Sequence, residues 1–76
     1  MTAVIIRPVR TPHATEWVVF FGDHSSLSGP VLVTSESYVG RYQIKTTARY
    51  EARCEAVLRN MEILWGGLVD ENDIAI

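Results

Sequence analysis

The tetrapeptide Asp23-His24-Ser25-Ser26 contains the residue types of an acyl-transfer triad. Such a triad holds an acid, a histidine base and a serine nucleophile in one hydrogen-bonded line, which adjacent residues do not easily form. Neither serine lies in a nucleophile-elbow motif. The segment is therefore interpreted as a polar loop in which Asp23 closes a local turn, and no catalytic residue is expected.

Metal coordination has few candidate ligands outside the acidic C-terminal segment. They are His13, Asp23, His24 and Cys54. A zinc site needs about four ligands at suitable spacing, and both histidines lie in predicted loops. Cys54 is the sole cysteine, so no intrachain disulfide forms, and its position on the apolar side of a predicted helix indicates a buried small side chain. We expect neither a metal site nor a cofactor.

The segment Asp70, Glu71 and Asp73 is the best case for paired carboxylates. Such carboxylates can hold a hard cation, but the segment lacks the glycine turn and the final glutamate of an EF-hand. A solvated acidic turn is the commoner explanation. The segment also offers a surface to a basic partner.

The clearest chemical pattern is the segregation of charge. From Arg41 to Arg59 five basic residues outnumber two acidic ones, a local charge of +3, although the whole chain carries −2. The basic residues are Arg41, Lys45, Arg49, Arg53 and Arg59. Tyr38, Tyr42 and Tyr50 interleave with them, as aromatic residues do in single-stranded nucleic-acid sites and in protein–protein hot spots.

The spacing of these charges predicts their neighbours on a helix. Arg49 and Arg53 lie one turn apart and repel each other unless an anionic group meets them. Glu55 and Arg59 should form an ion pair on a neighbouring face. A solvated helix surface accounts for the same charges without any partner.

The strands that position these residues are predicted near 3–9, 16–21, 31–34 and 38–45. Pro8 lacks an amide hydrogen, so the first strand should lie at a sheet edge or end there. The second strand is apolar on both sides, which indicates a central strand covered by a helix on one face and by a partner on the other.

The alternation in the last long strand assigns its residues to two faces. Tyr38, Tyr42 and Ile44 should share the face that meets the core. The face toward solvent or a ligand should carry Val39, Arg41, Gln43 and Lys45.

One helix is predicted from about Ala48 to Trp65, with Thr46 or Thr47 as its N-cap and Gly66-Gly67 at its end. Its apolar residues recur at spacings of three and four and should face the sheet. They are Tyr50, Cys54, Val57, Leu58, Met61, Leu64 and Trp65. Residues 74–76 are an optional last strand.

The order β-β-β-β-α indicates an α+β fold: a small antiparallel sheet of three to five strands with one long helix packed on one face. The 76 residues form a single domain, 1–76, whose 47% hydrophobic and 21% charged residues are ordinary for a globular protein. The N-terminus does not match a signal peptide, and no apolar run approaches the roughly 20 residues of a membrane span. We therefore expect a cytoplasmic protein with no membrane contact.

Three strands followed by a helix, with Trp17 on an early strand and Lys45-Thr46 before the helix, resemble the arm-site DNA-binding domain of tyrosine integrases over residues 16–65. This resemblance implies nucleic-acid binding. In size and composition the chain is also similar to small phage-encoded inhibitors, including anti-CRISPR proteins. That similarity implies docking on a larger host complex.

Three functional hypotheses follow. The first is a small non-enzymatic protein-binding module, an inhibitor or regulator from a mobile element. Its expected contact residues are Arg41, Lys45, Arg49, Arg53, Tyr38, Asp70, Glu71 and Asp73. The alternative is a nucleic-acid-binding domain. In it, Arg41, Lys45, Arg49 and Arg53 contact phosphates and the Tyr38 ring stacks on a nucleobase. The third is an enzyme subunit with a shared active site.

Because strand 16–21 is apolar on both faces, the sequence also predicts a homodimer or a tightly held partner.

Overall fold

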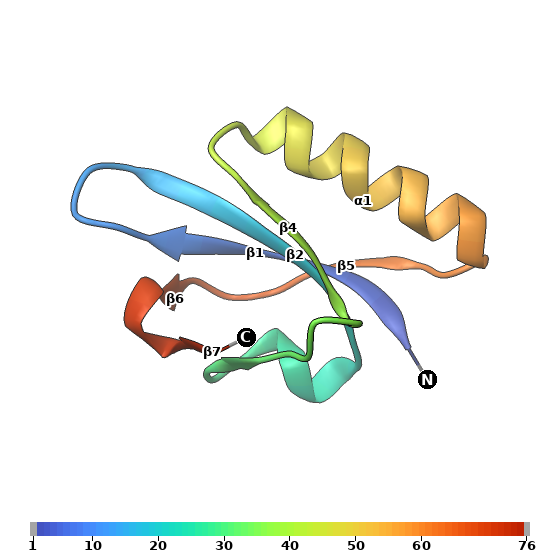
Figure 1. The fold of residues 1–76 in the computed structure, drawn as a ribbon, viewed down its shortest axis with the longest axis horizontal. Helices are drawn as coiled ribbons and strands as arrows, with labels where there is room; N and C mark the ends of the chain where they lie inside the picture. Colours follow the sequence, from blue (N-terminus) through green and yellow to red (C-terminus); the bar gives the residue numbers. More distant parts are fainter. Residues whose placement is uncertain (1, 76) are drawn as a thin grey trace.

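The computed structural model of the protein describes residues 2–75. Within them the chain forms seven strands, one α-helix and two short 3₁₀ helices. In chain order these are β1 (Ala3–Arg10), β2 (Thr15–Gly22), η1 (His24–Leu27), β3 (Val31–Leu32), β4 (Tyr38–Tyr42), α1 (Lys45–Arg59), β5 (Ile63–Trp65), β6 (Val69–Asp70), η2 (Glu71–Asp73) and β7 (Ile74–Ala75). Figure 1 shows α1 above the main sheet and a thin layer of short elements below it.

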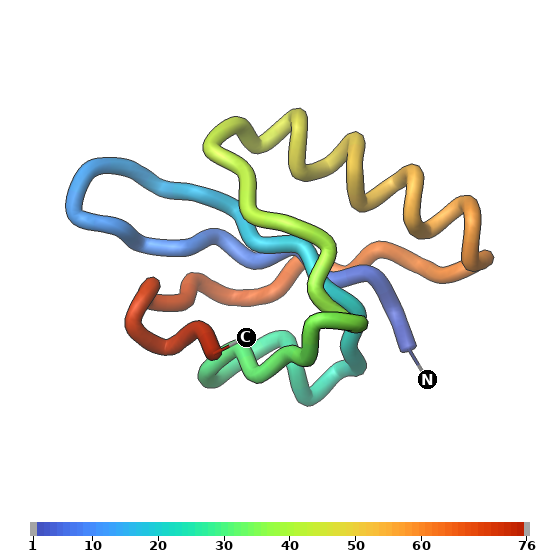
Figure 2. Tube along the Cα trace, viewed as in Figure 1, coloured from blue at the N-terminus to red at the C-terminus, as the bar shows by residue number. Residues whose placement is uncertain are grey.

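The main sheet has the strand order β4-β2-β1-β5, and β6 pairs with the far end of β1. The neighbours β4, β2 and β1 are antiparallel, as expected, whereas β5 and β6 run parallel to β1. The sheet is therefore mixed. β2 lies between β4 and β1, which confirms the prediction that it is a central strand, and β1 is central as well, between β2 on one edge and β5 and β6 on the other. The predicted α+β class, with one helix on one face of a small sheet, is confirmed. Figure 2 shows the same path as a tube.

Pro8 lies inside this central strand, so the prediction of an edge position is wrong. Gly66 N–H donates to Ile6 O at 2.9 Å, which shows that the backbone groups of Ile6 face β5. Pro8 is two residues further on and faces the same way. Pairing with β5 ends at Ile6 and pairing with β6 begins at Val9. Pro8 therefore occupies a gap where no ladder bond needs its missing N–H.

The face of the sheet opposite α1 is covered by the chain itself. The short elements η1, β3 and β7 lie beneath it, and β3 pairs with β7 as a separate parallel ribbon (Figure 1). The buried residues there, which we call the lower cluster, are Ile5, Val9, Val18, Phe20, Val31 and Val69. The second apolar face of β2 is thus buried within the chain, where the sequence predicted an external partner. The last strand comprises Ile74–Ala75, and Ile76 lies outside the described residues.

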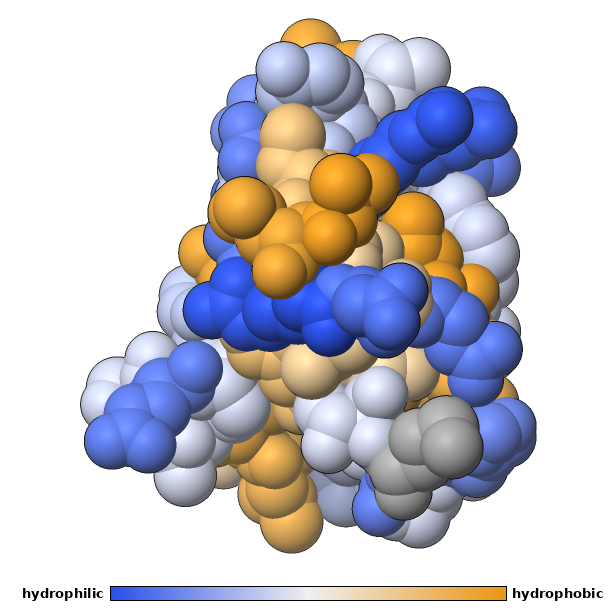
Figure 3. Space-filling view, turned by 90° about the vertical axis from the view of Figure 1, so that its right-hand side faces the viewer, coloured by the Kyte–Doolittle hydropathy of each residue, from blue (hydrophilic) through white to orange (hydrophobic). Residues whose placement is uncertain are grey.

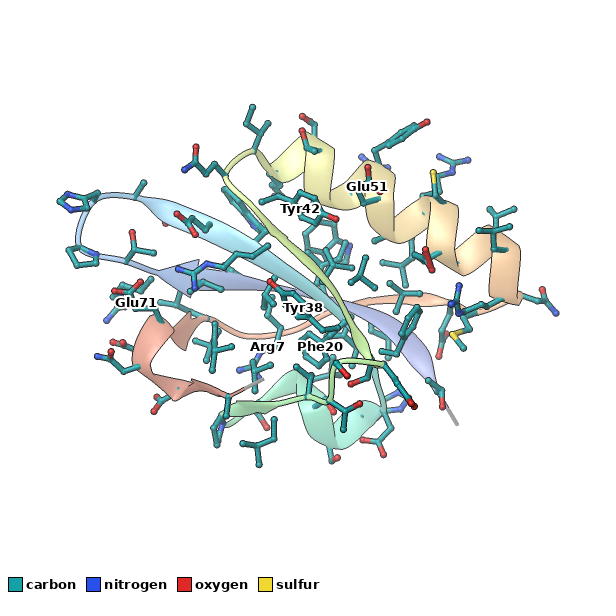
Figure 4. The ribbon with its side chains drawn as sticks, in the orientation of Figure 1. Arg7, Phe20, Tyr38, Tyr42, Glu51 and Glu71 are labelled. Carbon is teal, nitrogen blue, oxygen red and sulfur yellow. The ribbon has the colours of Figure 1, made fainter. Side chains whose placement is uncertain are left out.

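Arg7 is buried beside the lower cluster, with 1% of its surface exposed. Its Nε donates to Gly67 O at 3.0 Å and its Nη1 donates to Ser26 O at 3.2 Å. Burial of the guanidinium lowers the pKa of Arg7. A Cβ on Gly66 would lie 2.6 Å from Arg7 Cγ, so this glycine makes room for the arginine stem. Arg7 thereby fastens η1 and the β5–β6 connection to the underside of β1 (Figure 4).

The helix packs on the other face of the sheet through alanines. Ala48, Ala52 and Ala56 are the buried residues of α1. They form the upper cluster together with Val4, Ile6 and Val19 of the sheet. Small side chains at a helix–sheet contact let the two backbones lie close together. The larger buried side chains of this contact therefore come from the sheet, as the isoleucine and valines of β1 and β2.

The larger apolar residues of α1 point away from the sheet. Tyr50, Val57 and Leu58 are 66%, 75% and 77% exposed, and Cys54 is exposed as well. The part of the predicted stripe that lies in α1 is therefore on the outside of the helix, and the predicted burial of Cys54 is wrong. The cause is that the alanines already occupy the side that faces β1 and β2. Of the remaining stripe residues, which follow the helix, Met61 packs against the upper cluster and Leu64 against the lower cluster.

The ends of α1 also differ from the prediction. Asn60 takes the left-handed conformation, with φ 54° and ψ 49°, and Met61 N–H donates to Ala56 O at 2.9 Å. Glycine most often takes this left-handed cap conformation, and asparagine also accepts it. The helix therefore ends here and not at Gly66-Gly67. The residues after it form β5. At the start, Ile44 is the N-cap without a side-chain hydrogen bond, so neither threonine caps the helix.

A β-bulge reassigns the faces of β4. Phe20 pairs with Tyr38 and Val19 pairs with Gly40, which leaves Val39 as an extra residue. Tyr38 consequently packs against the lower cluster, while Val39 and Tyr42 pack against the upper cluster. The prediction that Tyr38 and Tyr42 share a face, with Val39 on the other, is wrong because it assumed unbroken alternation.

The alanine contact makes a stability prediction. Replacing Ala52 with leucine forces extra carbons between α1 and the sheet, and we expect the free energy of unfolding to fall by about 1–3 kcal/mol. Leu58→Ala removes an exposed side chain and should change it by less than about 0.5 kcal/mol. Urea unfolding of dilute protein, followed by circular dichroism, measures both. A larger loss for Leu58→Ala than for Ala52→Leu would show that α1 packs the other way round.

Candidate functional site

Five side chains line a shallow depression on the solvent side of α1. They are Tyr50, Arg53, Cys54, Val57 and Leu58, and we call them the outer face of α1. Their spacing of three and four residues is the pattern by which a helix buries one side. Here the opposite side of the helix is the buried one, so the outer face has no cover within residues 2–75. Figure 3, an end-on view, shows apolar surface in the upper part of the molecule, between hydrophilic side chains.

The two flanks of the outer face carry opposite charges. Successive helical residues are rotated by about 100°, so Glu51 and Arg53 stand on opposite sides of the line through Tyr50 and Cys54. The residues one turn away repeat this arrangement. The acidic flank consists of Glu51 and Glu55, and the basic flank consists of Arg49 and Arg53.

Glu51 of the acidic flank lies above Tyr42 (Figure 4). Burial of the phenol raises the pKa of Tyr42, and the charges of Glu51, Tyr38 and Glu55 raise it further. The predicted ion pair between Glu55 and Arg59 is confirmed, with Arg59 Nη1 at 2.5 Å from a Glu55 carboxylate oxygen. Glu55 is thus partly neutralised, and Glu51 makes no ion pair within the described part of the chain.

Two of the predicted contact bases are engaged inside the molecule. Arg41 forms ion pairs with Glu16 and, at 3.2 Å, with Glu71. Burial disfavours its charge, but the hydrogen bonds and charges of these two glutamates outweigh that cost and raise the pKa of Arg41. Lys45 opens α1, and its ammonium lies 5.3 Å from the centre of the Trp65 ring. Both cations are therefore already placed against groups of this chain.

Arg49 and Arg53 remain exposed on the helix. Neither forms an ion pair with another residue between 2 and 75. Of the predicted contact residues, these two lie at the outer face of α1, and Arg53 belongs to it.

The other predicted contact residues lie elsewhere. Tyr38 is half-buried and packs against the lower cluster, away from the outer face of α1. Asp70 accepts a hydrogen bond from Asn72 N–H at 3.1 Å and caps η2, while Glu71 bonds Arg41. Asp73 is exposed in η2. The structure thus brings Arg41 and Glu71 together but does not gather the predicted residues into one surface.

The segment Asp23–Ser26 is a structural turn, as the sequence predicts. The Asp23 carboxylate accepts hydrogen bonds from Ser25 N–H at 2.9 Å and from the Ser25 hydroxyl, and it caps η1. These two bonds lower the pKa of Asp23. The serine hydroxyl therefore bonds the acid, whereas a triad would require it to bond a histidine.

Residues 2–75 contain no group of three His, Cys, Asp or Glu side chains placed to hold a metal ion. Within the same residues, no helix has the length and apolar character that crossing a membrane requires. Comparisons with protein-family models, curated proteins and solved structures give no match to this chain.

The position of Glu51 can be tested through the pKa of Tyr42. Glu51→Gln removes a negative charge near the phenol, so the pKa of Tyr42 should fall toward the ordinary value of about 10. A spectrophotometric tyrosine titration measures it, with Glu62→Gln as the control variant that should change nothing. Because folding raises the pKa of Tyr42, the stability that its protonated phenol contributes is fully present below the pKa of the unfolded chain. That contribution is lost as the pH rises through the pKa of the folded protein. An unchanged Tyr42 titration in Glu51→Gln would place Glu51 elsewhere.

Proposed function

We propose that the protein is a non-enzymatic protein-binding module and that the outer face of α1 is its contact surface. The observation that carries the proposal is the exposure of Tyr50, Val57 and Leu58 at helical spacing on a helix whose core contacts are made by alanines. Fully burying a Val or Leu side chain contributes about 1.5–3 kcal/mol. A partner that covers this face would gain that contribution.

The composition of the outer face supports protein contact. Tyrosine and arginine are enriched among the residues that dominate protein–protein binding energies, and the outer face contains Tyr50 and Arg53. Apolar side chains at its centre with charges at its edges match the anatomy of such interfaces. A helix that presents one apolar face fits the groove of a partner or another helix.

Nucleic-acid binding has less support. It would need several free bases along one surface, but Arg41 is paired with two glutamates and Lys45 lies against Trp65. Tyr38 is packed against the lower cluster.

A cytoplasmic setting is part of the proposal, because a reducing compartment keeps the exposed free thiol of Cys54 reduced.

Two leucines of nearly equal exposure provide a matched test. Leu58 is 77% exposed on the outer face, and Leu32 is 75% exposed on β3. We expect Leu58→Asp to abolish partner binding, because it places a charge within the apolar contact. Leu32→Asp should leave binding unchanged. The measurement is quantitative capture from nuclease-treated lysate with tagged wild-type protein and both variants, after circular dichroism has shown that both are folded.

The proteins captured by the wild type, Leu58→Asp and Leu32→Asp are compared to decide whether the outer face is the contact surface. Binders shared by the wild type and Leu32→Asp but lost from Leu58→Asp support the outer face, and a larger host complex among them would fit the inhibitor hypothesis. Equal capture by both variants would overturn the proposed surface. Recovery of nucleic acid that is released by salt would favour the nucleic-acid hypothesis instead.

A further inference from the structure

We propose that the outer face of α1 binds a second copy of this chain, with the two α1 helices side by side and parallel about a two-fold axis. This inference rests on the proposed function and names the partner of the same surface. It depends on the arrangement of charge around the apolar residues. The sequence also predicts a homodimer, but from the second face of β2, which the lower cluster buries.

The apolar positions follow the repeat of a two-helix contact. Tyr50, Cys54 and Val57 are separated by four and three residues, which is the spacing of the inward positions of a coiled coil. Thr47, which is also exposed, continues this spacing toward the N-terminal end of α1. Each copy of α1 thus offers a narrow seam that a second, identical helix fits.

The flanks decide the relative direction of the two helices. A two-fold axis parallel to the helices brings the basic flank of each copy against the acidic flank of the other. A two-fold axis perpendicular to the helices gives antiparallel pairing, in which like flanks meet. Like charges repel and unlike charges attract, so the meeting of the basic flank of one copy with the acidic flank of the other selects the parallel arrangement.

Parallel pairing also places identical residues opposite each other along the whole seam. Cys54 of one copy then lies next to Cys54 of the other, close to the axis, and Tyr50 and Val57 meet their own copies in the same way. In an antiparallel pair, only the residue at the crossing point meets its own copy. This difference makes the direction of the helices measurable.

The size of the contact sets its strength. A helix of 15 residues is about 22 Å long, and one face of it provides less than the roughly 800 Å² per partner of a standard stable interface. The expected dimer is therefore weak and in equilibrium with monomer. Sedimentation velocity over a range of concentrations should show a fast monomer–dimer exchange.

A charge swap tests the pairing of flanks. Arg53→Glu alone and Glu51→Arg alone should each raise the dimer dissociation constant by roughly tenfold, because each places like charges together twice per dimer. An equimolar mixture of the two variants should recover the dimer, because both contacts are then between unlike charges. Leu32→Asp is the control that should dimerise like the wild type, and circular dichroism verifies each fold.

Cross-linking tests the direction. A short bismaleimide should link Cys54 to its copy in the wild type. It should link equally well through Tyr50→Cys or Val57→Cys, each combined with Cys54→Ala. Efficient linkage at one position and none at the others would show an antiparallel pair and overturn the inference. Sedimentation as monomer at every concentration would also overturn it, whereas the proposed function would fall only if Leu58→Asp kept its captured partners.

Discussion

The contact of Ala48, Ala52 and Ala56 with β1 and β2 is the constraint on which the rest of the structure depends. It holds α1 close to the sheet and fixes the rotation of the helix about its own axis. With the alanines inward, the residues at the opposite positions must face solvent. The chemistry of the exposed surface, an apolar seam with a charged flank on each side, therefore follows from which side of one helix carries the small residues.

The lower layer explains why the underside of the sheet is not an exposed apolar face. Short elements cover the underside of the sheet, and Arg7 ties them to β1 by donating to two backbone carbonyls. A buried guanidinium requires such acceptors, and the absence of a side chain at Gly66 leaves room for its stem. Both faces of the sheet are thus covered within the chain, and the sheet needs no partner to bury it.

The sequence predicts the class of the fold, the two strands that become β1 and β2, and the Glu55–Arg59 pair, because each depends on local pattern. It does not predict the rotation of α1. Two apolar stripes of this helix could face the sheet, the alanines or the larger apolar residues. The stripe of larger side chains is the stronger periodic signal in the sequence. The alanine stripe wins because the sheet residues already fill the available volume, which is a property of the tertiary structure. The spacing of Ala48, Ala52 and Ala56 by four residues was the available signal. The sequence prediction also missed the bulge at Val39 and the helix cap at Asn60.

The central claim is that α1 turns its large apolar residues outward, and methyl NMR with a soluble paramagnetic agent tests it most directly. In dilute protein, the methyl signals of Val57 and Leu58 should be broadened as strongly as those of Leu32, because all three are exposed. The methyl signals of Val4, Ile6 and the three alanines should persist. Protected Val57 and Leu58 methyls together with broadened alanine methyls would contradict the account, because the outer face would then be the core.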